Sequence, residues 1–331
     1  MKTKAMLLVL LIVFLVTGTV AGCTAPSAAP AAGSEAQPQA TASVKPYIPM
    51  ISKAYPQHPF WQGVMRGAEK AAKDFNVETT FEGTDTDEQV DRQLGMLQKA
   101  LDRKAAAICF AASDSQAAIP LLQKARDAHI PVIAFDSGVD SDIPVTTAAT
   151  DNIAAAAAAA DHMAQLLGKA GEVAIIAHDQ TSRSGFDRVK GFTDAIKTKY
   201  PNITIVSTDY GAGNALKSSV IVTTVIRDHP NLKGYFGAND GSVVGLLNAV
   251  KELKKEGQIV VVGFDSGVQQ INAIQSGVEA GAITQDPIGM GYKCIEAAVK
   301  ALNGQTLPAT IDTGWQWYDK TNIDDPALAP L

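Results

Sequence analysis

Short runs of β-branched and apolar residues alternate with amphipathic helical runs along most of this chain. Strands are predicted at Tyr47–Ser52, Glu78–Glu82, Ala105–Ala111, Pro131–Phe135, Val173–Ala177, Thr204–Ser207, Gly234–Gly237, Ile259–Phe264 and Gly281–Thr284. Helices are predicted between them, among them Phe60–Phe75, Asp87–Arg103, Gln116–His129, Arg188–Lys199, Ala215–Asp228 and Ser242–Lys255. Such alternation is typical of parallel βαβ units with helices on both faces of the sheet. It predicts a doubly wound α/β protein, in which ligands bind at the carboxyl ends of the strands.

One strand and its following turn occur twice. Ile130–Val139 reads Ile-Pro-Val-Ile-Ala-Phe-Asp-Ser-Gly-Val, and Ile259–Val268 reads Ile-Val-Val-Val-Gly-Phe-Asp-Ser-Gly-Val. Asp136 and Asp265 are 265 − 136 = 129 residues apart, whereas solenoid repeats have periods of about 20–50 residues. The alternative is chance recurrence of a strand-end turn. The repeat favours two related lobes, each with an Asp at its binding edge.

The first residues have the pattern of a secretory signal peptide. Two lysines precede the uncharged apolar run Ala5–Val16, which is short for a membrane span of about 20 residues. Val20-Ala21-Gly22-Cys23 then resembles a bacterial lipobox, in which the cysteine becomes the lipidated N-terminus. The alternative is an ordinary signal peptide with a chance cysteine. Residues 24–43 are rich in Ala, Pro, Ser and Gln, a composition that predicts a disordered tether.

Charge and cysteine content exclude several classes of protein. The net charge of the chain is −6 and no basic run occurs, which argues against nucleic-acid binding. Three cysteines cannot form a disulfide framework. Cys109 and Cys294 lie in apolar patterns, so we expect both to be buried free thiols.

Motifs of catalysis are missing from the sequence. It contains no G-x-x-x-x-G-K-[ST] loop, G-x-S-x-G elbow or H-E-x-x-H helix. Its five histidines lack the spacing of metal ligands. We therefore expect a protein that is not an enzyme and that holds neither a cofactor nor a metal.

The residues at the predicted strand ends suit a polyhydroxylated ligand. Sugar hydroxyls donate and accept hydrogen bonds, and the apolar faces of sugar rings stack on aromatic rings. Phe60 and Trp61 follow the first strand, Asp136 and Asp265 end the twin strands, and Asn239 and Gln285 follow two others. Each of these polar residues could instead cap a helix or a turn. Their recurrence at one edge favours a common binding site.

At these residues the chain resembles the type I solute-binding proteins of bacterial sugar ABC transporters, of the ribose/galactose group. The resemblance extends from Tyr47 to Trp317. It rests on Pro-Phe-Trp after the first strand, Ile-Pro-Val-Ile-x-x-Asp, Ala-Thr-Asp-Asn, Asn-Asp, Val-Val-Gly-Phe-Asp and Gln285. It implies two doubly wound parallel-sheet lobes joined by three hinge crossovers, near Thr147–Asn152, Ala282–Asp286 and Pro308–Gly314. The expected division is 1–22 signal peptide, 23–44 lipidated N-terminus and tether, 45–148 plus 283–308 N-terminal lobe, and 149–282 plus 309–331 C-terminal lobe.

The resemblance also implies which residues contact the ligand. They are His58, Phe60, Trp61, Asp136, Ser137, Arg188, Asn239, Asp265 and Gln285. Ser137 stands where ribose binders have an Arg, and His58 where they have an Asn. Arg188 or Arg183 is then the candidate guanidinium, and the ligand is left as a monosaccharide or polyol.

The implied function is capture of this ligand outside the cytoplasm and its delivery to an ABC permease and its ATPase. The chain would act as a monomer held at the membrane by the lipid on Cys23. The alternative function is that of a ligand carrier for a chemoreceptor or sensor kinase. A transcriptional regulator with the same lobes would need an N-terminal DNA-binding helix pair, and an extracellular glycosidase would need an acid/base pair.

Overall fold

A computed structural model describes residues 45–54, 58–325 and 328. The predicted signal peptide, Cys23 and the predicted tether lie outside the described residues. The lobes belong to one compact unit, Val44–Leu331. Among the described residues, no helix is both long and apolar enough to cross a membrane.

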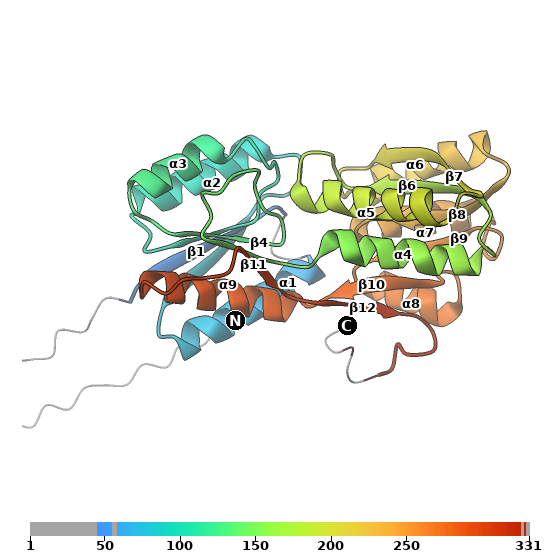
Figure 1. The fold of residues 1–331 in the computed structure, drawn as a ribbon. Coiled ribbons are helices and arrows are strands. Elements are labelled where there is room, and N and C mark those ends of the chain that lie inside the picture. Colours follow the sequence, from blue (N-terminus) through green and yellow to red (C-terminus); the bar gives the residue numbers. More distant parts are fainter. Residues whose placement is uncertain (1–44, 55–57, 326–327, 329–331) are drawn as a thin grey trace, which may run out of the picture. The chain divides into compact units, whose positions relative to one another are not determined.

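The first lobe is a parallel sheet covered by helices on both faces (Figure 1). Its strand order is β11-β5-β4-β3-β1-β2, and all neighbouring strands are parallel. α1 packs beside α9 on one face, and α2 and α3 cover the other. The elements are β1 (Tyr47–Ser52), α1 (Pro59–Asp74), β2 (Glu78–Gly83), α2 (Val90–Asp102), β3 (Ile108–Phe110), α3 (Ile119–Asp127), β4 (Val132–Phe135), β5 (Thr146–Ala149), α9 (Pro287–Leu302) and β11 (Thr310–Asp312).

The second lobe repeats this topology. Its strand order is β12-β10-β9-β8-β6-β7, and only β12 runs antiparallel to its neighbour. α4 and α5 cover one face of the sheet, while α6 and α7 cover the other. The elements are α4 (Asn152–Leu166), β6 (Gly171–Ala177), α5 (Arg183–Lys199), β7 (Ile203–Tyr210), α6 (Ala215–Asp228), β8 (Leu232–Gly237), α7 (Asp240–Glu252), β9 (Val260–Phe264), α8 (Val268–Ser276), β10 (Gly281–Gln285) and β12 (Trp315–Tyr318).

The two-lobe α/β fold predicted from the sequence is confirmed. The chain passes between the sheets three times: after β5, after β10, and between β11 and β12. The lobe limits differ from the predicted ones by a few residues. Residues 283–285 belong to the second sheet, because β10 pairs with β9 and β12 up to its end. Residues 310–312 belong to the first sheet, because β11 pairs in parallel with β5.

The twin strands occupy equivalent places in the two lobes. β4 and β9 each precede the strand after which the chain leaves its lobe. The backbone N–H of Asp136 donates to Ala148 O, and that of Asp265 donates to Ile283 O. Both aspartates adopt the left-handed backbone conformation, with φ of 56° and 79°. Asp tolerates this conformation better than most residues with a side chain, so the repeated turn is a structural equivalence.

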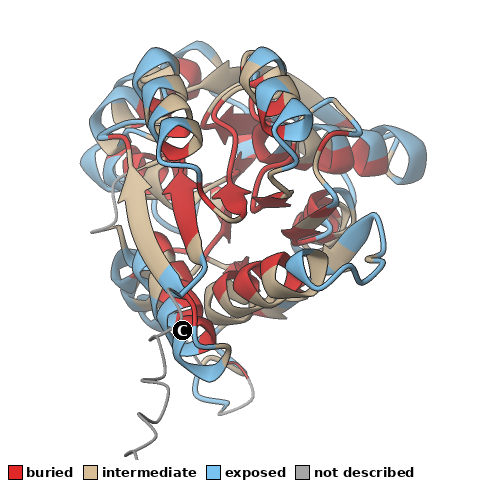
Figure 2. Cartoon of the chain, turned by 90° about the vertical axis from the view of Figure 1, so that its left-hand side faces the viewer, coloured by how far each residue is buried: buried red, intermediate tan, exposed pale blue. Residues whose placement is uncertain are grey.

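Helices meet at small residues in both lobes. α4, which contains a run of alanines, packs its buried alanines against the second sheet and α5. A Cβ atom at Gly191 of α5 would lie only 2.4 Å from Ile153 O. The strands and inward helix faces form the buried interior, while the outer helix faces are exposed (Figure 2). Cys109 and Cys294 are buried and free, as predicted.

Candidate functional site

A cavity of about 330 Å³ lies between the two lobes, where the carboxyl ends of their strands face each other. We call this cavity the cleft. Its volume is at the low end of the range of about 300–1,000 Å³ for small-molecule pockets. It is lined by Lys53, Ala54, His58, Phe60, Trp61, Asp85, Thr86, Asp87, Asp136, His178, Arg188, Ala212, Gly213, Asn214, Ala215, Asn239, Asp240, Gly241, Val244, Asp265, Gln269 and Gln285.

The structure brings eight of the nine predicted ligand-contacting residues together in the cleft: His58, Phe60, Trp61, Asp136, Arg188, Asn239, Asp265 and Gln285. Ser137 is the exception. It is fully buried, and its hydroxyl accepts a hydrogen bond of 3.4 Å from the backbone N–H of Ser184. Ser137 therefore joins the first lobe to the start of α5, rather than lining the cleft.

Arg188 is held rigidly beneath the second-lobe wall of the cleft. Its Nε donates to Asn152 Oδ1 at 2.7 Å, and one terminal nitrogen donates to Ala238 O at 2.9 Å. The guanidinium lies 3.8 Å from the ring centroid of Phe264. The same terminal nitrogen lies 4.0 Å from Asp265 Oδ2. Partners on several sides fix the planar guanidinium in place.

Asp265 is oriented by three groups of its own lobe. Gln285 Nε2 donates to Asp265 Oδ1 at 2.6 Å, and the backbone N–H of Asp240 donates to Oδ2 at 2.9 Å. Arg188 supplies a nearby positive charge. The hinge residue Gln285 thus fixes a cleft carboxylate.

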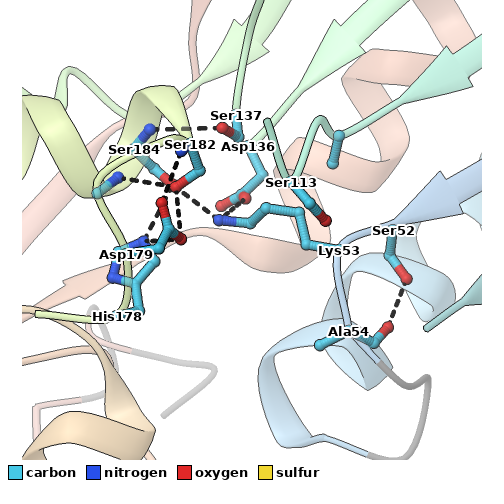
Figure 3. A network of polar contacts seen from close by, with 12 residues as sticks. Ser52, Lys53, Ala54, Ser113, Asp136, Ser137, His178, Asp179, Ser182 and Ser184 are labelled. Carbon is cyan, nitrogen blue, oxygen red and sulfur yellow. Dashed lines mark hydrogen bonds and ion pairs between the residues drawn. The ribbon is translucent and has the colours of Figure 1, made fainter. Parts of the chain in front are cut away.

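Lys53, which the sequence interpretation missed, is the centre of a polar network in the cleft (Figure 3). Its Nζ lies 3.3 Å from Asp136 Oδ2 and donates to Ser184 Oγ of the other lobe at 2.8 Å. Burial disfavours the charge of Lys53, but the carboxylates of Asp136 and Asp87 outweigh burial and raise its pKa above the ordinary value. Lys53 is therefore a cation that is already paired.

His178 and Asp87 are two further cleft residues that were not predicted. Burial lowers the pKa of His178 to about 3, so its imidazole is neutral near pH 7. Burial within the cleft raises the pKa of Asp87 to about 6, against the opposing effect of Lys53. Part of Asp87 is still in contact with solvent. Position offered a signal for Lys53 and His178, because they directly follow β1 and β6.

His58 and Asp240 form a contact between the lobes. His58 Nε2 lies 3.2 Å from Asp240 Oδ2, and Gln270 Nε2 donates to Asp240 Oδ1 at 3.0 Å. Burial opposes the charge of His58, but its bond to Asp240 raises the pKa of His58 above 6.5. For Asp240, the bonds from His58 and Gln270 outweigh burial and lower the carboxyl pKa. The neighbouring Asn239 is the N-cap of α7, and its Oδ1 accepts a hydrogen bond of 3.1 Å from the backbone N–H of Ser242. Asn239 also lines the cleft.

The two predicted aromatic residues lie in the cleft but do not present parallel faces. Their ring centroids are 4.9 Å apart and the rings are inclined at 82°. Trp61 is only 5% exposed and packs edge-on against Phe135. Phe60 is partly buried and is the more accessible of the two rings. The ring of Phe60 is therefore the one that could stack on a ligand.

The polar groups of the cleft suit hydrogen bonding. Within the described ranges, no three or more His, Cys, Asp and Glu side chains lie together in a way that could hold a metal ion. Carboxylates and amides accept and donate side by side, and an aromatic ring offers an apolar surface. This arrangement can hold a small molecule with several hydroxyl groups.

Residues 48–306 match the family described as "Periplasmic binding protein domain". The chain belongs to the periplasmic binding protein family. Membership in a family of binding proteins agrees with the expectation that the chain is not an enzyme.

Several members of the periplasmic binding protein family resemble this chain along most of their length. The D-allose-binding periplasmic protein of Escherichia coli is 26% identical over 260 residues, covering 76% of this chain and 83% of its own. A carbohydrate transporter solute binding protein from Agrobacterium radiobacter, solved in complex with D-arabinose, has a TM-score of 0.82. It is 32% identical and covers 86% of this chain and 98% of its own. A solute binding protein from Agrobacterium vitis with bound D-fucose has the same TM-score and identity, and covers 85% and 98% of the two chains.

Proposed function

We propose that this chain is an extracytoplasmic substrate-binding protein that captures a neutral monosaccharide or polyol in the cleft and delivers it to an ABC importer. The observation that carries the proposal is the cleft itself. It lies between two lobes and is lined by oriented carboxylates and amides together with an accessible aromatic ring. The related proteins solved with D-arabinose and D-fucose support a sugar as the ligand.

The charges of the cleft support an uncharged ligand. Both of its strongest cations are already engaged, Lys53 by Asp136 and Arg188 by backbone and amide oxygens. Carboxylates outnumber these cations in the cleft wall. A sugar acid or a sugar phosphate would bring further negative charge to this wall without a free cation to meet it.

A thermal-shift screen tests the ligand class, because a molecule that binds only the folded protein raises its melting temperature. D-Arabinose, D-fucose, D-allose, D-ribose and D-sorbitol form the neutral set, and D-glucuronate and D-ribose 5-phosphate form the acidic set. We expect a rise with at least one neutral compound and none with the acidic ones. A shift with an acidic compound alone would contradict the proposal.

Two carboxylate substitutions test the placement of the ligand. With the neutral sugar that gives the largest shift, Asp136→Ala and Asp265→Ala should each cost at least about 2 kcal/mol of affinity, because buried partners are left unpaired. Calorimetry gives the affinities. Asp142→Ala, which truncates an exposed carboxylate of the lobe that carries Asp136, is the control and should bind normally. Unchanged affinity in both cleft variants would place the ligand elsewhere.

We also propose that the mature chain is a monomer anchored to the membrane through a lipid on Cys23. The support is the Val-Ala-Gly-Cys motif after a short apolar run, followed by a tether-like segment. Membrane fractionation of cells that express Cys23→Ser tests the anchor. The variant should move to the soluble extracytoplasmic fraction, whereas the control Ser27→Ala should stay with membranes. A Cys23→Ser protein that still fractionates with membranes would refute lipidation at this residue.

A further inference from the structure

Glu279 is a buried carboxyl group behind the second-lobe wall of the cleft. It lies between α8 and β10, and the residue is 1% exposed. Neither of its carboxyl oxygens has a hydrogen-bond partner among residues 45–54, 58–325 and 328. An ionised carboxylate in such a place would lose its hydration without compensation, which is among the costliest arrangements in a protein interior.

A second unpartnered oxygen faces the same small space. Gln270 is fully buried, and its Oε1 also has no partner within the described part of the chain. A Cβ atom at Gly263 would lie 2.2 Å from Glu279 Oε1 and 2.6 Å from Gln270 Oε1, so both oxygens lie beside Gly263. Two buried acceptors that share so small a space repel each other unless a proton lies between them.

The amide nitrogen of Gln270 contacts a residue of the cleft wall. Gln270 Nε2 donates to Asp240 Oδ1 at 3.0 Å and to Phe264 O at 3.1 Å. The second carboxyl oxygen of Asp240 meets His58 Nε2 of the other lobe at 3.2 Å. Asp240 and His58 both line the cleft. A continuous row of polar groups therefore runs from Glu279 to the contact between the lobes.

We propose that Glu279 is a protonated positioning residue, which donates its proton to Gln270 Oε1 and thereby holds the Asp240–His58 pair in the cleft wall. The part played in ligand binding rests on the proposed function of the cleft, but the proton and its effect on the pair do not. A donor at Glu279 holds the oxygen end of the Gln270 amide, as Asp240 Oδ1 and Phe264 O hold its nitrogen end. Without that donor the amide oxygen is left buried and unpaired, and the hold of Gln270 on Asp240 weakens.

The surroundings of Glu279 keep the proton in place. Burial and the negative charge of Asp240 raise the pKa of the Glu279 carboxyl well above its usual range. Tyr318 of β12 is a further titratable group beside this acid. The Tyr318 hydroxyl donates to Asp265 O at 2.8 Å, so it is engaged elsewhere. Within the described structure, no cation is among the groups that shift this carboxyl.

Nuclear magnetic resonance on the ligand-free protein tests the proposal without any sugar. The carboxyl carbon of Glu279 reports its own protonation, and the ring nitrogens of His58 report the pKa of that imidazole. We expect the Glu279 carboxyl to keep its proton well above the pH at which an ordinary glutamate ionises. We also expect His58 to titrate above 6.5, because Asp240 stabilises its charged form.

Two variants of Glu279 distinguish a positioning role of its proton from a role of the side chain in packing. Glu279→Gln keeps a hydrogen-bond donor and leaves the side chain uncharged. The pKa of His58 should therefore be the same as in the unsubstituted protein. Glu279→Met fills a similar volume without a donor, so the pKa of His58 should fall as Asp240 loses its fixed place. Ile274→Val, at a buried neighbour of the same lobe, controls for loss of packing and should leave the pKa of His58 unchanged.

Combining variants tests whether Glu279 acts through Gln270. In a Gln270→Met background, changing Glu279 to Met should have no further effect on the pKa of His58, because the link is already broken. Three results would overturn the proposal. They are a Glu279 carboxyl that ionises below pH 5, a folded Glu279→Met protein with an unchanged His58 pKa, and a fall of that pKa in Glu279→Gln. The last result would show that the group acts as a negative charge.

Discussion

At the scale of residues, the charged groups of the cleft are mostly paired with other groups of the protein. Asp265 is held by Gln285 and a backbone N–H, and Asp136 lies against Lys53. Asp87 differs from these two. Its pKa is raised to about 6, so the folded protein disfavours its charge. Carboxyl groups destabilised in this way are common at binding sites, where stability is given up for function.

Replacing Asp87 tests whether its ionised carboxyl lowers the stability of the folded protein, because such an effect depends on pH. The pKa of about 6 in the folded protein lies above the ordinary aspartate value of 3.8, which applies to the unfolded chain. The folded state therefore binds more protons between these two values, and stability falls as pH rises through them. Asp87→Asn removes the titration. We expect calorimetry to show a higher melting temperature for the variant near neutral pH, with a gain that disappears towards pH 4. Asp85→Asn, at an exposed carboxylate of the same loop, is the control. A gain that is equal at both pH values would contradict the assignment.

At the scale of elements, close helix packing joins chain segments that are far apart in sequence. α1 and α9 cross at glycines: a Cβ atom at Gly67 would lie 1.9 Å from Ile288 O, and one at Gly291 would lie 1.9 Å from Val64 O. No side chain fits at either point unless the backbone moves. This contact docks α9, which follows the second crossover, onto the first helix of the fold.

Two glycine-to-alanine variants compare this contact with an open helix surface. Gly67→Ala should destabilise the protein by about 1–3 kcal/mol, because it overpacks the contact between α1 and α9. Gly95→Ala lies within α2 with no atom near its added methyl group. It should instead stabilise by about 0.5–1 kcal/mol through helix propensity. Chemical denaturation measures both changes, and equal effects would show that the tight contact carries no energetic weight.

At the scale of the whole molecule, contacts between the lobes border the cleft. The backbone N–H of Ser115 donates to Thr181 O at 2.9 Å, and Thr181 Oγ1 donates to Ser113 O at 3.1 Å. Elsewhere Lys217 Nζ of the second lobe donates to Glu88 Oε1 of the first at 2.9 Å. Lobes of this kind open and close by hinge rotation. Such contacts would then form on closure, and they would favour the state that holds the ligand.

A charge swap tests the Lys217–Glu88 contact. Lys217→Glu places like charges opposite each other and should weaken sugar binding at low salt by up to about fivefold, since exposed pairs contribute about 0.2–1 kcal/mol. Adding Glu88→Lys restores opposite charges and should recover the affinity. Calorimetry at low and high salt measures the effect. A loss that persists at high salt, or that the double variant does not reverse, would mean that the pair does not act by charge.

The fold class and the place of the cleft at the strand ends could be predicted from the residues alone. Alternating strand and helix runs specify parallel βαβ units, and parallel strands bring their carboxyl ends to one edge. Residues at strand ends, such as Asp136 and Asp265, were therefore predictable from position alone. The short strands β5, β11 and β12 were not, because three or four residues with mixed exposure carry no clear periodicity.

The pairing of these residues depends on how the chain packs in three dimensions. It turned Ser137 away from the cleft, placed Lys53 between Asp136 and Ser184, and set the rings of Phe60 and Trp61 nearly at right angles. The physical reason is that the electrostatic environment of a group depends on neighbours that are distant in sequence. Glu279 shows this most clearly, because its 1% exposure and its place beside Gly263 and Gln270 arise only when α8 and β10 pack together.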